Sequence, residues 1–292
     1  MNLYEVLEQG AVVIGDGGMG TMLQSAGLEA GGVPELWNID HAEAVERILD
    51  GYATAGARYV TTNTFGGSAP RLALHGLQDR VHELNVAGAA LARRVADRHG
   101  AFVAGDVGPT GELLFPLGVY TAEEAEQAFA DQIEGLVAGG ADFILIETMS
   151  DLAEVEAAVQ AAQRVAPSVP IVATMSFDTN GRTMMGVTPA AAVERLAAAG
   201  VRVIGGNCGR GPEQMEQVLA EMSAARPDGV FLIAQSNAGL PVLHGDVFEY
   251  DATPALMADH ARRLRELGAD VIGACCGSTP EHIAAMHAAV AA

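Results

Sequence analysis

The stretch Asp270-Val-Ile-Gly-Ala-Cys275-Cys276-Gly-Ser-Thr-Pro280-Glu-His282 shows the unit from which this fold is built. Its apolar run, Val271–Ala274, has the composition of a buried strand. The Ser-Thr-Pro-Glu sequence after the cysteines is typical of a helix start, with a capping residue and proline in the first turn. The stretch therefore predicts a strand, a turn that carries two adjacent cysteines, and a helix.

The same strand-and-helix unit recurs along the whole chain. The apolar runs are rich in Val, Ile and Phe and do not alternate with polar residues, as is typical of parallel strands buried on both faces. The predicted strands are Val12–Gly15, Tyr59–Thr64, Phe102–Asp106, Phe143–Glu147, Ile171–Ser176, Val203–Asn207, Phe231–Gln235 and Val271–Ala274. Stretches with helical periodicity follow them, at Ala42–Ala55, Gln78–Arg98, Ala122–Ala138, Leu152–Ala166, Pro189–Ala199, Pro212–Ala225, Pro254–Leu267 and Pro280–Ala289.

Eight such units without a linker or a break in composition predict an α/β protein. We expect one domain over residues 1–292, folded as a single (β/α)8 TIM barrel. A doubly wound open sheet is the alternative. In both folds the carboxyl ends of the strands meet at one face, where ligands bind.

All three cysteines of the chain lie at carboxyl ends of predicted strands. Cys208 follows one apolar run, and Cys275 and Cys276 follow another 67 positions later. Three thiolates that converge there suit Zn²⁺ with its fourth position open. The alternative is that these cysteines are small core residues. Adjacent strand residues also point to opposite faces, so a shared metal requires a turn at the pair, which Gly277 allows.

Polar residues follow other strands at the same predicted face. The glycines after Asp16 let backbone amides approach a carboxylate, while Asp16 itself suits an ammonium group. Glu147 is expected to anchor substrate, with helix capping as the alternative, and Asn237 to bind substrate or approach the metal. These groups fit an amino acid, and zinc stabilises a deprotonated sulfur. We therefore expect an enzyme that activates an amino-acid thiol.

Composition excludes several other classes. The net charge of −21 argues against nucleic acid and anionic membranes as partners. All 16 basic residues are arginine, so chemistry through a lysine Schiff base is excluded. Neither a signal peptide nor a membrane span is visible, and a cytoplasmic location is expected. Among the eight histidines, only His244 is predicted in a loop near the site; the others are assigned to helices.

Four motifs together resemble the homocysteine S-methyltransferase family, and most closely the homocysteine-binding module of cobalamin-dependent methionine synthase. They are Asp-Gly-Gly-Met-Gly-Thr at 16–21, Thr-Asn-Thr-Phe-Gly-Gly at 62–67, Gly-Gly-Asn-Cys-Gly at 205–209 and Gly-Ala-Cys-Cys-Gly-Ser-Thr-Pro at 273–280. The resemblance implies a (β/α)8 barrel in which Cys208, Cys275 and Cys276 hold catalytic Zn²⁺. It also implies that homocysteine thiolate takes the fourth position and attacks the donor's methyl carbon.

The resemblance also implies a set of substrate contacts. Asp16 and Glu147 match the positions for the homocysteine ammonium, the amides of Gly17 and Gly18 those for its carboxylate, and Thr64 and Asn237 complete the predicted substrate-binding set. In the methionine synthase version, an asparagine at the position of Asn237 can occupy zinc when substrate is absent.

The methyl donor is less well defined. Betaine-using relatives cage a quaternary ammonium with aromatic residues, whereas Gly66, Gly67 and Thr148 stand in the corresponding stretches here. No folate or corrinoid module is visible in the 292 residues, so we expect methylcobalamin on a separate corrinoid protein. Small sulfonium donors such as S-methylmethionine, or betaine, are the alternative. A non-catalytic zinc-binding subunit of a corrinoid system and a sugar-phosphate lyase are hypotheses from other classes. A homo-oligomer would be ordinary for a barrel.

Overall fold

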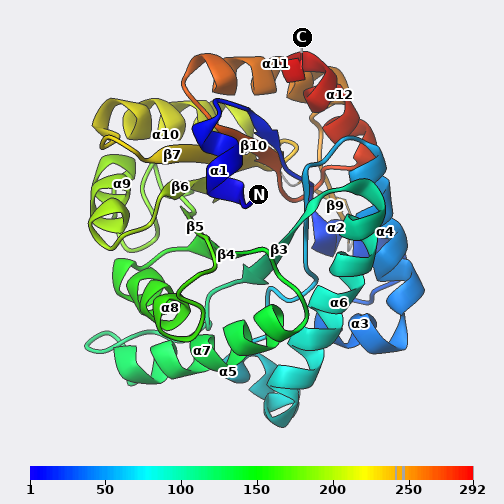
Figure 1. Ribbon diagram of the computed structural model, residues 1–292, viewed down its shortest axis with the longest axis vertical. Helices are drawn as coiled ribbons and strands as arrows, with labels where there is room; N and C mark the ends of the chain where they lie inside the picture. The colour runs from blue at the N-terminus through cyan, green and yellow to red at the C-terminus, as the bar shows by residue number, and fades with distance from the viewer. Residues whose placement is uncertain (241, 245–246, 292) are drawn as a thin grey trace.

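Eight parallel strands form a nearly closed ring with helices outside it (Figure 1). The computed structural model describes residues 1–240, 242–244 and 247–291. The strands are β1 (Val13–Ile14), β2 (Tyr59–Thr61), β3 (Phe102–Val107), β4 (Phe143–Met149), β5 (Ile171–Met175), β6 (Val203–Cys208), β7 (Phe231–Ser236) and β10 (Val271–Ala274). Their order around the ring is β1-β10-β7-β6-β5-β4-β3-β2. The predicted (β/α)8 barrel is confirmed, and the open sheet is not found.

The helices between the strands lie close to their predicted positions. They are α4 (Ala42–Thr54), α6 (Val81–His99), α7 (Ala122–Ala138), α8 (Leu152–Val165), α9 (Pro189–Ala198), α10 (Pro212–Ala225), α11 (Pro254–Glu266) and α12 (Pro280–Ala291). Thr188 and Thr253 cap α9 and α11 by accepting hydrogen bonds from the amides of Ala191 and Leu256, ahead of the prolines that signalled these helix starts. None of the described helices has both the length and the apolar character needed to cross a bilayer.

Several short elements were not predicted, because each is too short to show a clear period. They are α1 (Leu3–Glu8), α2 (Met19–Ser25), η1 (Pro34–Leu36), α3 (Trp37–Asp40), α5 (Ala69–Ala73) and the hairpin of β8 (Val242–His244) and β9 (Val247–Glu249). The helix predicted from Gln78 begins with a 3-10 turn, η2 (Gln78–Arg80), before α6. The strand predicted over residues 59–64 ends at Thr61. Beyond it the amide of Thr64 donates to the carbonyl of Thr62, which turns the chain away from the sheet. The side chain of His244 lies outside the described part of the chain.

Helix α1 covers the end of the barrel opposite the carboxyl ends of the strands (Figure 1). Leu3 and Leu7 pack with the apolar side chains that fill the barrel, including Phe143 of β4. The hydroxyl of Tyr4 both accepts from the amide of Ile171 and donates to its carbonyl, at 2.8 and 2.9 Å. The interior is therefore a packed core at this end, and a cavity can open only at the other.

A carboxylate closes the ring where β1 meets β2. One backbone hydrogen bond joins the two strands, from the amide of Arg58 to the carbonyl of Ile14 at 2.7 Å. Two residues after Ile14, the carboxylate of Asp16 accepts from the amide of Thr61 at 2.6 Å and from its hydroxyl at 2.7 Å. Asp16 is buried. Its side chain thus replaces backbone pairing and leaves its polar atoms satisfied.

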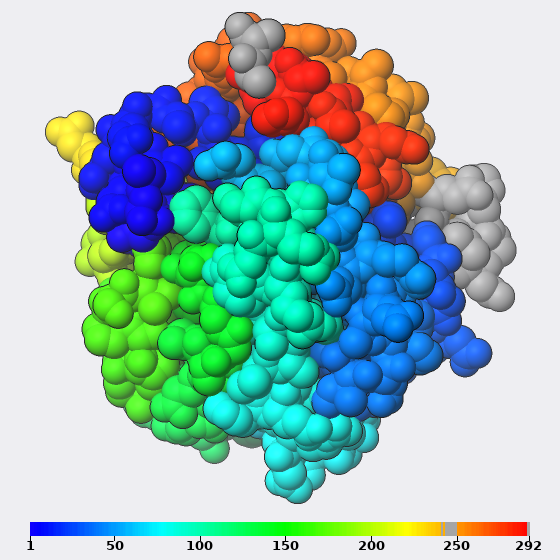
Figure 2. Space-filling model, turned by 45° about the vertical axis from the view of Figure 1, so that its right-hand side comes forward, coloured from blue at the N-terminus to red at the C-terminus, as the bar shows by residue number. Residues whose placement is uncertain are grey.

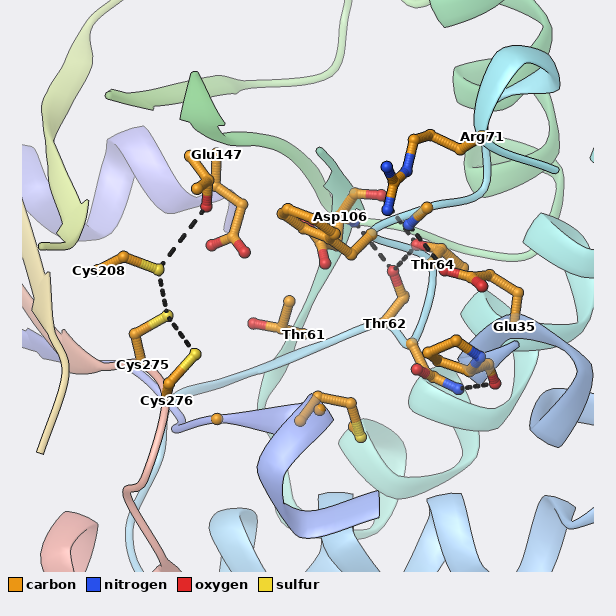
Figure 3. Close-up of a pocket in the computed structure, with 18 of the residues that line it drawn as sticks. Glu35, Thr61, Thr62, Thr64, Arg71, Asp106, Glu147, Cys208, Cys275 and Cys276 are labelled. Atoms are coloured by element: carbon orange, nitrogen blue, oxygen red, sulfur yellow. Dashed lines mark hydrogen bonds between the residues drawn. The ribbon is translucent and has the colours of Figure 1, made fainter. Parts of the chain in front are cut away.

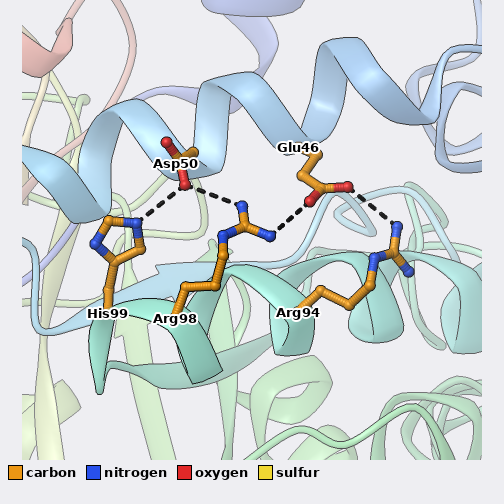
Figure 4. Close-up of polar contacts among 5 residues, drawn as sticks. All are labelled: Glu46, Asp50, Arg94, Arg98 and His99. Carbon is orange, nitrogen blue, oxygen red and sulfur yellow. Dashed lines mark hydrogen bonds and ion pairs between the residues drawn. The ribbon is translucent and has the colours of Figure 1, made fainter.

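Ion pairs join α4 to α6 on the outer surface, where the two helices lie side by side (Figure 2). Glu46 accepts from Arg94 and Arg98, and Asp50 accepts from Arg98 and His99 (Figure 4). The hydrogen bonds from Arg98 lower the pKa of Glu46. Exposed pairs of this kind contribute little individually, so the buried helix faces provide most of the packing energy.

Thr61→Val tests the closure between β1 and β2. The variant keeps the hydrogen bond from the backbone amide of residue 61 to the Asp16 carboxylate but removes the one from the hydroxyl. Because that carboxylate is buried, we expect a loss of about 1–3 kcal/mol in the free energy of unfolding. Thr179→Val, an exposed control, is expected to change it by less than about 0.5 kcal/mol. Urea denaturation measures both values. Equal stabilities would show that the Asp16–Thr61 contact does not hold the ring together.

Candidate metal and substrate site

The three cysteine sulfurs meet at the carboxyl ends of β6 and β10. The sulfur of Cys208 lies 3.0 Å from that of Cys275, which lies 4.0 Å from that of Cys276 (Figure 3). All three atoms lie within 4.8 Å of one another, and the cysteines are free thiols. The predicted convergence of sulfurs from distant parts of the chain is therefore found.

Sharp backbone turns aim these sulfurs. Strand β10 ends at Ala274, so the cysteine pair lies in the turn after it, where Gly277 has a φ of +80°. Cys208 has a φ of +57°, which costs energy in a residue with a side chain and is concentrated at functional sites. The alternation that would separate two adjacent strand cysteines thus does not apply.

A β-bulge at the end of β4 aims Glu147. The register with β5 shifts between Ile146 and Met149, and Thr148 has a φ of +61°. Asn207 accepts from the amide of Thr148 at 2.8 Å and donates to its hydroxyl at 2.7 Å. Bulges beside active sites commonly redirect a side chain, and here the carboxylate of Glu147 points into the cavity (Figure 3).

A cavity of about 460 Å³ lies beside the sulfurs. One side is formed by strand ends, with the three cysteines, Asp16, Asp106, Glu147 and Gln235. The other side is formed by the loops after β1 and β2, with Glu35, Phe65, Arg71 and His75 (Figure 3). This volume is typical of small-ligand sites.

Buried carboxyl groups dominate the strand side. Burial, and then the charges of Cys276 and Asp16, raises the pKa of Glu147 to about 8. Burial raises the pKa of Asp16 to about 7, although the hydrogen bonds from Thr61 oppose the shift. Burial and the charges of Glu147, Asp16 and Glu35 raise the pKa of Asp106 well above its usual range. A cation bound here would relieve this accumulation of negative charge.

The thiols share charge among themselves. Hydrogen bonds from Cys208 and Cys275 lower the pKa of Cys276 to about 3. The pKa of Cys275 is raised by its hydrogen bonds to Cys208 and Cys276 and by burial. This arrangement favours a thiolate at Cys276 that accepts hydrogen bonds from two neutral thiols. A metal ion that needs three thiolates would therefore displace the protons of Cys208 and Cys275.

The other predicted substrate residues lie at the site, but several already have partners. The amide of Gly18 donates to the hydroxyl of Ser278 at 3.0 Å, and Thr64 donates to the carbonyl of Asp106 at 2.8 Å. Asn237 donates to the carbonyl of Gly209 at 2.9 Å and accepts from the amide of Cys276 at 3.1 Å. Asn237 therefore ties the Cys208 loop to the cysteine pair. Direct contact of these residues with substrate stays a prediction.

Residue 18 must be glycine because its backbone lies close to that of Cys275. A Cβ atom there would lie 2.7 Å from the carbonyl oxygen of Cys275, nearer than side chains tolerate. Ser278 completes the contact, because its hydroxyl donates to the same carbonyl at 2.6 Å. The glycine motif after β1 thus supports the cysteine turn as well as offering amides.

Sequence reasoning missed several residues that line the cavity. Asp106 was noted only as a strand end, and Gln235 was not singled out. Arg71 was not considered, and His75 was assigned to a helical surface, although it follows α5 and lines the loop side. In the sequence, Asp106 and Gln235 are marked only by their position at the ends of predicted strands. Arg71 and His75 are marked only by their position shortly after Gly66 and Gly67.

A buried chain of hydrogen bonds supports the end of β7. The ring of His260 bonds Ser236 at 2.8 Å and Glu216 at 2.7 Å. Both Ser236 and His260 are fully buried, and neither lines the cavity. The serine–histidine–glutamate chain therefore holds the end of β7 in place and does not act as a catalytic triad. The carbonyl of Ser236 accepts from the amide of Cys275 at 2.8 Å, which links the chain to the sulfurs.

The cysteine cluster fits a tetrahedral zinc ion. Zinc–sulfur bonds of about 2.3 Å place the sulfurs of a tetrahedral site about 3.8 Å apart. The Cys275–Cys276 separation of 4.0 Å matches this, and the 3.0 Å separation of Cys208 and Cys275 would have to widen slightly. The donor set of three sulfurs with one open direction, toward the cavity, is that of a catalytic rather than a structural site.

Comparisons with known proteins agree with this geometry. A family model described as homocysteine S-methyltransferase matches residues 13–290. The chain is 37% identical to a methionine synthase of Mycobacterium tuberculosis and 35% identical to one of Mycobacterium leprae, over 99% of its own length. It spans a quarter of the length of these relatives. The metallated homocysteine methyltransferase MmuM of Escherichia coli has the same fold, with a TM-score of 0.79, 22% identity and 97% and 98% of the two chains covered.

The raised pKa of Glu147 predicts a pH dependence of stability. Its pKa of about 8 in the folded state lies above the ordinary value of about 4.3. The folded protein therefore holds more protons between these values, and the free energy of unfolding falls as pH rises from about 4.5 to 8. Glu147→Gln removes this contribution and makes the dependence shallower.

Denaturation of the metal-free protein between pH 5 and 8.5 measures the effect. The exposed Glu83, whose pKa is lowered by Arg80, provides the control, and Glu83→Gln is expected to keep the wild-type slope in this range. An identical slope for Glu147→Gln and wild type would contradict the assignment.

Proposed function

Because the chain belongs to the homocysteine S-methyltransferase family, we propose that it transfers a methyl group to the sulfur of homocysteine and produces methionine. The observation that carries the proposal is the convergence of three free cysteines beside a cavity lined with buried carboxyl groups. The sulfurs suit the metal that such a thiol needs, and the carboxyl groups suit the ammonium of an amino acid.

Cys208, Cys275 and Cys276 would hold Zn²⁺. Zinc bound there would lower the pKa of the substrate thiol, so that the thiolate is the reacting form at neutral pH. Asp16 and Glu147 would orient the substrate through its ammonium. The glycine turn after β1 would receive its carboxylate, with the amide of Gly18 exchanging its bond to Ser278 for one to the substrate. The substrate sulfur then attacks the methyl carbon, and the sulfur–carbon bond forms as the bond from the methyl group to the donor breaks.

Two asparagines set the position of the sulfurs. Asn237 joins the backbone at Gly209 to the amide of Cys276, and Asn207 holds Thr148 next to Cys208.

The free thiols of the site require a reducing compartment, which supports the cytoplasm as the proposed location.

Methylcobalamin on a separate corrinoid protein remains the proposed methyl donor. Phe65 is the only phenylalanine, tyrosine or tryptophan among the described residues that line the cavity, and Trp37 does not line it. A single ring provides no cage for a quaternary ammonium, so betaine is disfavoured. Small sulfonium donors need no such cage and are the second candidate.

Metal analysis tests the zinc site. Purified protein is expected to contain one zinc per chain after dialysis, and Cys208→Ala, Cys275→Ala and Cys276→Ala each to lose it, because two thiolates bind zinc far more weakly than three. Met184→Ala removes an exposed sulfur group in the loop after β5 and is the control that keeps the metal. Zinc retained by all three cysteine variants would rule the site out.

A donor screen tests the reaction itself. With homocysteine and zinc-loaded protein held constant, we expect methionine to form with methylcobalamin or a methylated corrinoid protein. Betaine, S-methylmethionine and S-adenosylmethionine are the comparison donors, and mass spectrometry of the product is the measurement. Product with betaine would contradict our interpretation of the aromatic residues. Zinc binding without product from any donor would favour a non-catalytic subunit.

A further inference from the structure

The strand side of the cavity contains two buried side-chain oxygens that have no hydrogen-bond partner among the described residues. Asp106 is 4% exposed, lines the cavity, and has a buried Oδ1 atom with no hydrogen-bond partner among the described residues. Gln235 is 3% exposed, lines the same cavity, and its Oε1 atom is likewise buried without a described partner. Buried acceptors of this kind are rare and costly, so each calls for a donor from a ligand.

The position of the Asp106 carboxylate is set by its backbone. Its amide donates to the hydroxyl of Thr62 at 2.9 Å, and its carbonyl accepts from Thr64 at 2.8 Å. Gln132 of α7 reaches the same carbonyl at 3.3 Å. With its backbone held from three sides, Asp106 directs its side chain into the cavity toward Glu147 (Figure 3).

Gln235 reaches the cavity from the opposite part of the ring. It lies on β7 beside Gly273 of β10, and its side chain crosses the space that a Cβ at Gly273 would need. Its amide makes no hydrogen bond with a described residue, so its oxygen is free to turn toward a donor. The two unpartnered acceptors thus line the same cavity as Glu147.

No described cation forms an ion pair with Asp106, while its acidic neighbours oppose its ionisation. A ligand suited to this place has several N–H donors, a positive charge and no acceptor. An ammonium group has these properties, with three N–H donors. Asp106, Glu147, Gln235 and the three cysteines line one cavity, so an ammonium group bound there shares the cavity with a sulfur at the cysteines.

We propose that Asp106 and Gln235 join Asp16 and Glu147 in binding the ammonium group of the homocysteine substrate, and so determine that the enzyme accepts an amino-acid thiol rather than a simple thiol. This inference rests on the proposed function and extends it to two residues outside the expected anchors.

The test compares homocysteine with 4-mercaptobutyrate, which has the same chain and carboxylate but lacks the ammonium group. Calorimetry on zinc-loaded protein measures both dissociation constants. Wild type is expected to prefer homocysteine by at least about a hundredfold, because the ammonium group makes several charged hydrogen bonds. Asp106→Asn is expected to reduce that preference by about ten- to a hundredfold, as for loss of a charged hydrogen bond, and Gln235→Leu by about three- to tenfold. Binding of 4-mercaptobutyrate stays unchanged in both variants.

Glu154→Gln is the matched control. Glu154 is also buried and accepts from the amide and hydroxyl of Thr110 at 2.8 and 2.6 Å, but it does not line the cavity. Its variant is expected to keep the wild-type preference, which separates the ammonium contact from general loss of packing.

The outcomes distinguish this inference from the proposed function. If wild type prefers homocysteine and Asp106→Asn and Gln235→Leu keep that preference, the assignment of these two residues is wrong although the proposed function stands. The same holds if both variants weaken the two thiols equally. If wild type binds neither thiol, the proposed function fails and the assignment fails with it.

Discussion

The contact between Asp16 and Thr61 is the constraint on which the rest of the structure depends. A ring of parallel strands must pair its first and last members, and here a side chain does part of that work. Immediately after Asp16 the chain lies against the carbonyl of Cys275, where Ser278 also bonds. Ring closure and the position of the cysteine turn are therefore properties of the same few residues.

The carboxyl groups on the strand side of the cavity lower the stability of the folded protein but suit it to binding a ligand. Asp106, Glu147 and Asp16 bury carboxyl groups near one another, and burial raises the pKa of each. The opposite end of the barrel, which α1 covers, consists of apolar side chains and satisfied backbone. A barrel of this kind tolerates unfavourable groups at one end because the other end provides an undisturbed core.

The fold was predictable because its signals are local and repeated. Each strand begins with an apolar run, and helix starts such as Thr188 and Thr253 carry their own capping chemistry. The cysteines were predictable because the carboxyl ends of parallel strands meet. The hydrogen-bond partners of Asn237 and the lack of partners of Asp106 were not, since both depend on side chains brought together from distant strands.

The two sides of the cavity differ in how freely they can change. The cysteines and the carboxyl groups stand at ends of paired strands, where a small shift would disturb the ring. Glu35, Phe65, Arg71 and His75 belong to the short helices and loops between the main barrel elements, and connecting segments of this kind accept substitution and insertion far more readily. The strand-end groups can thus stay fixed while the connecting segments diverge, so one barrel scaffold can pair the same cysteines and carboxyl groups with outer walls of different chemistry.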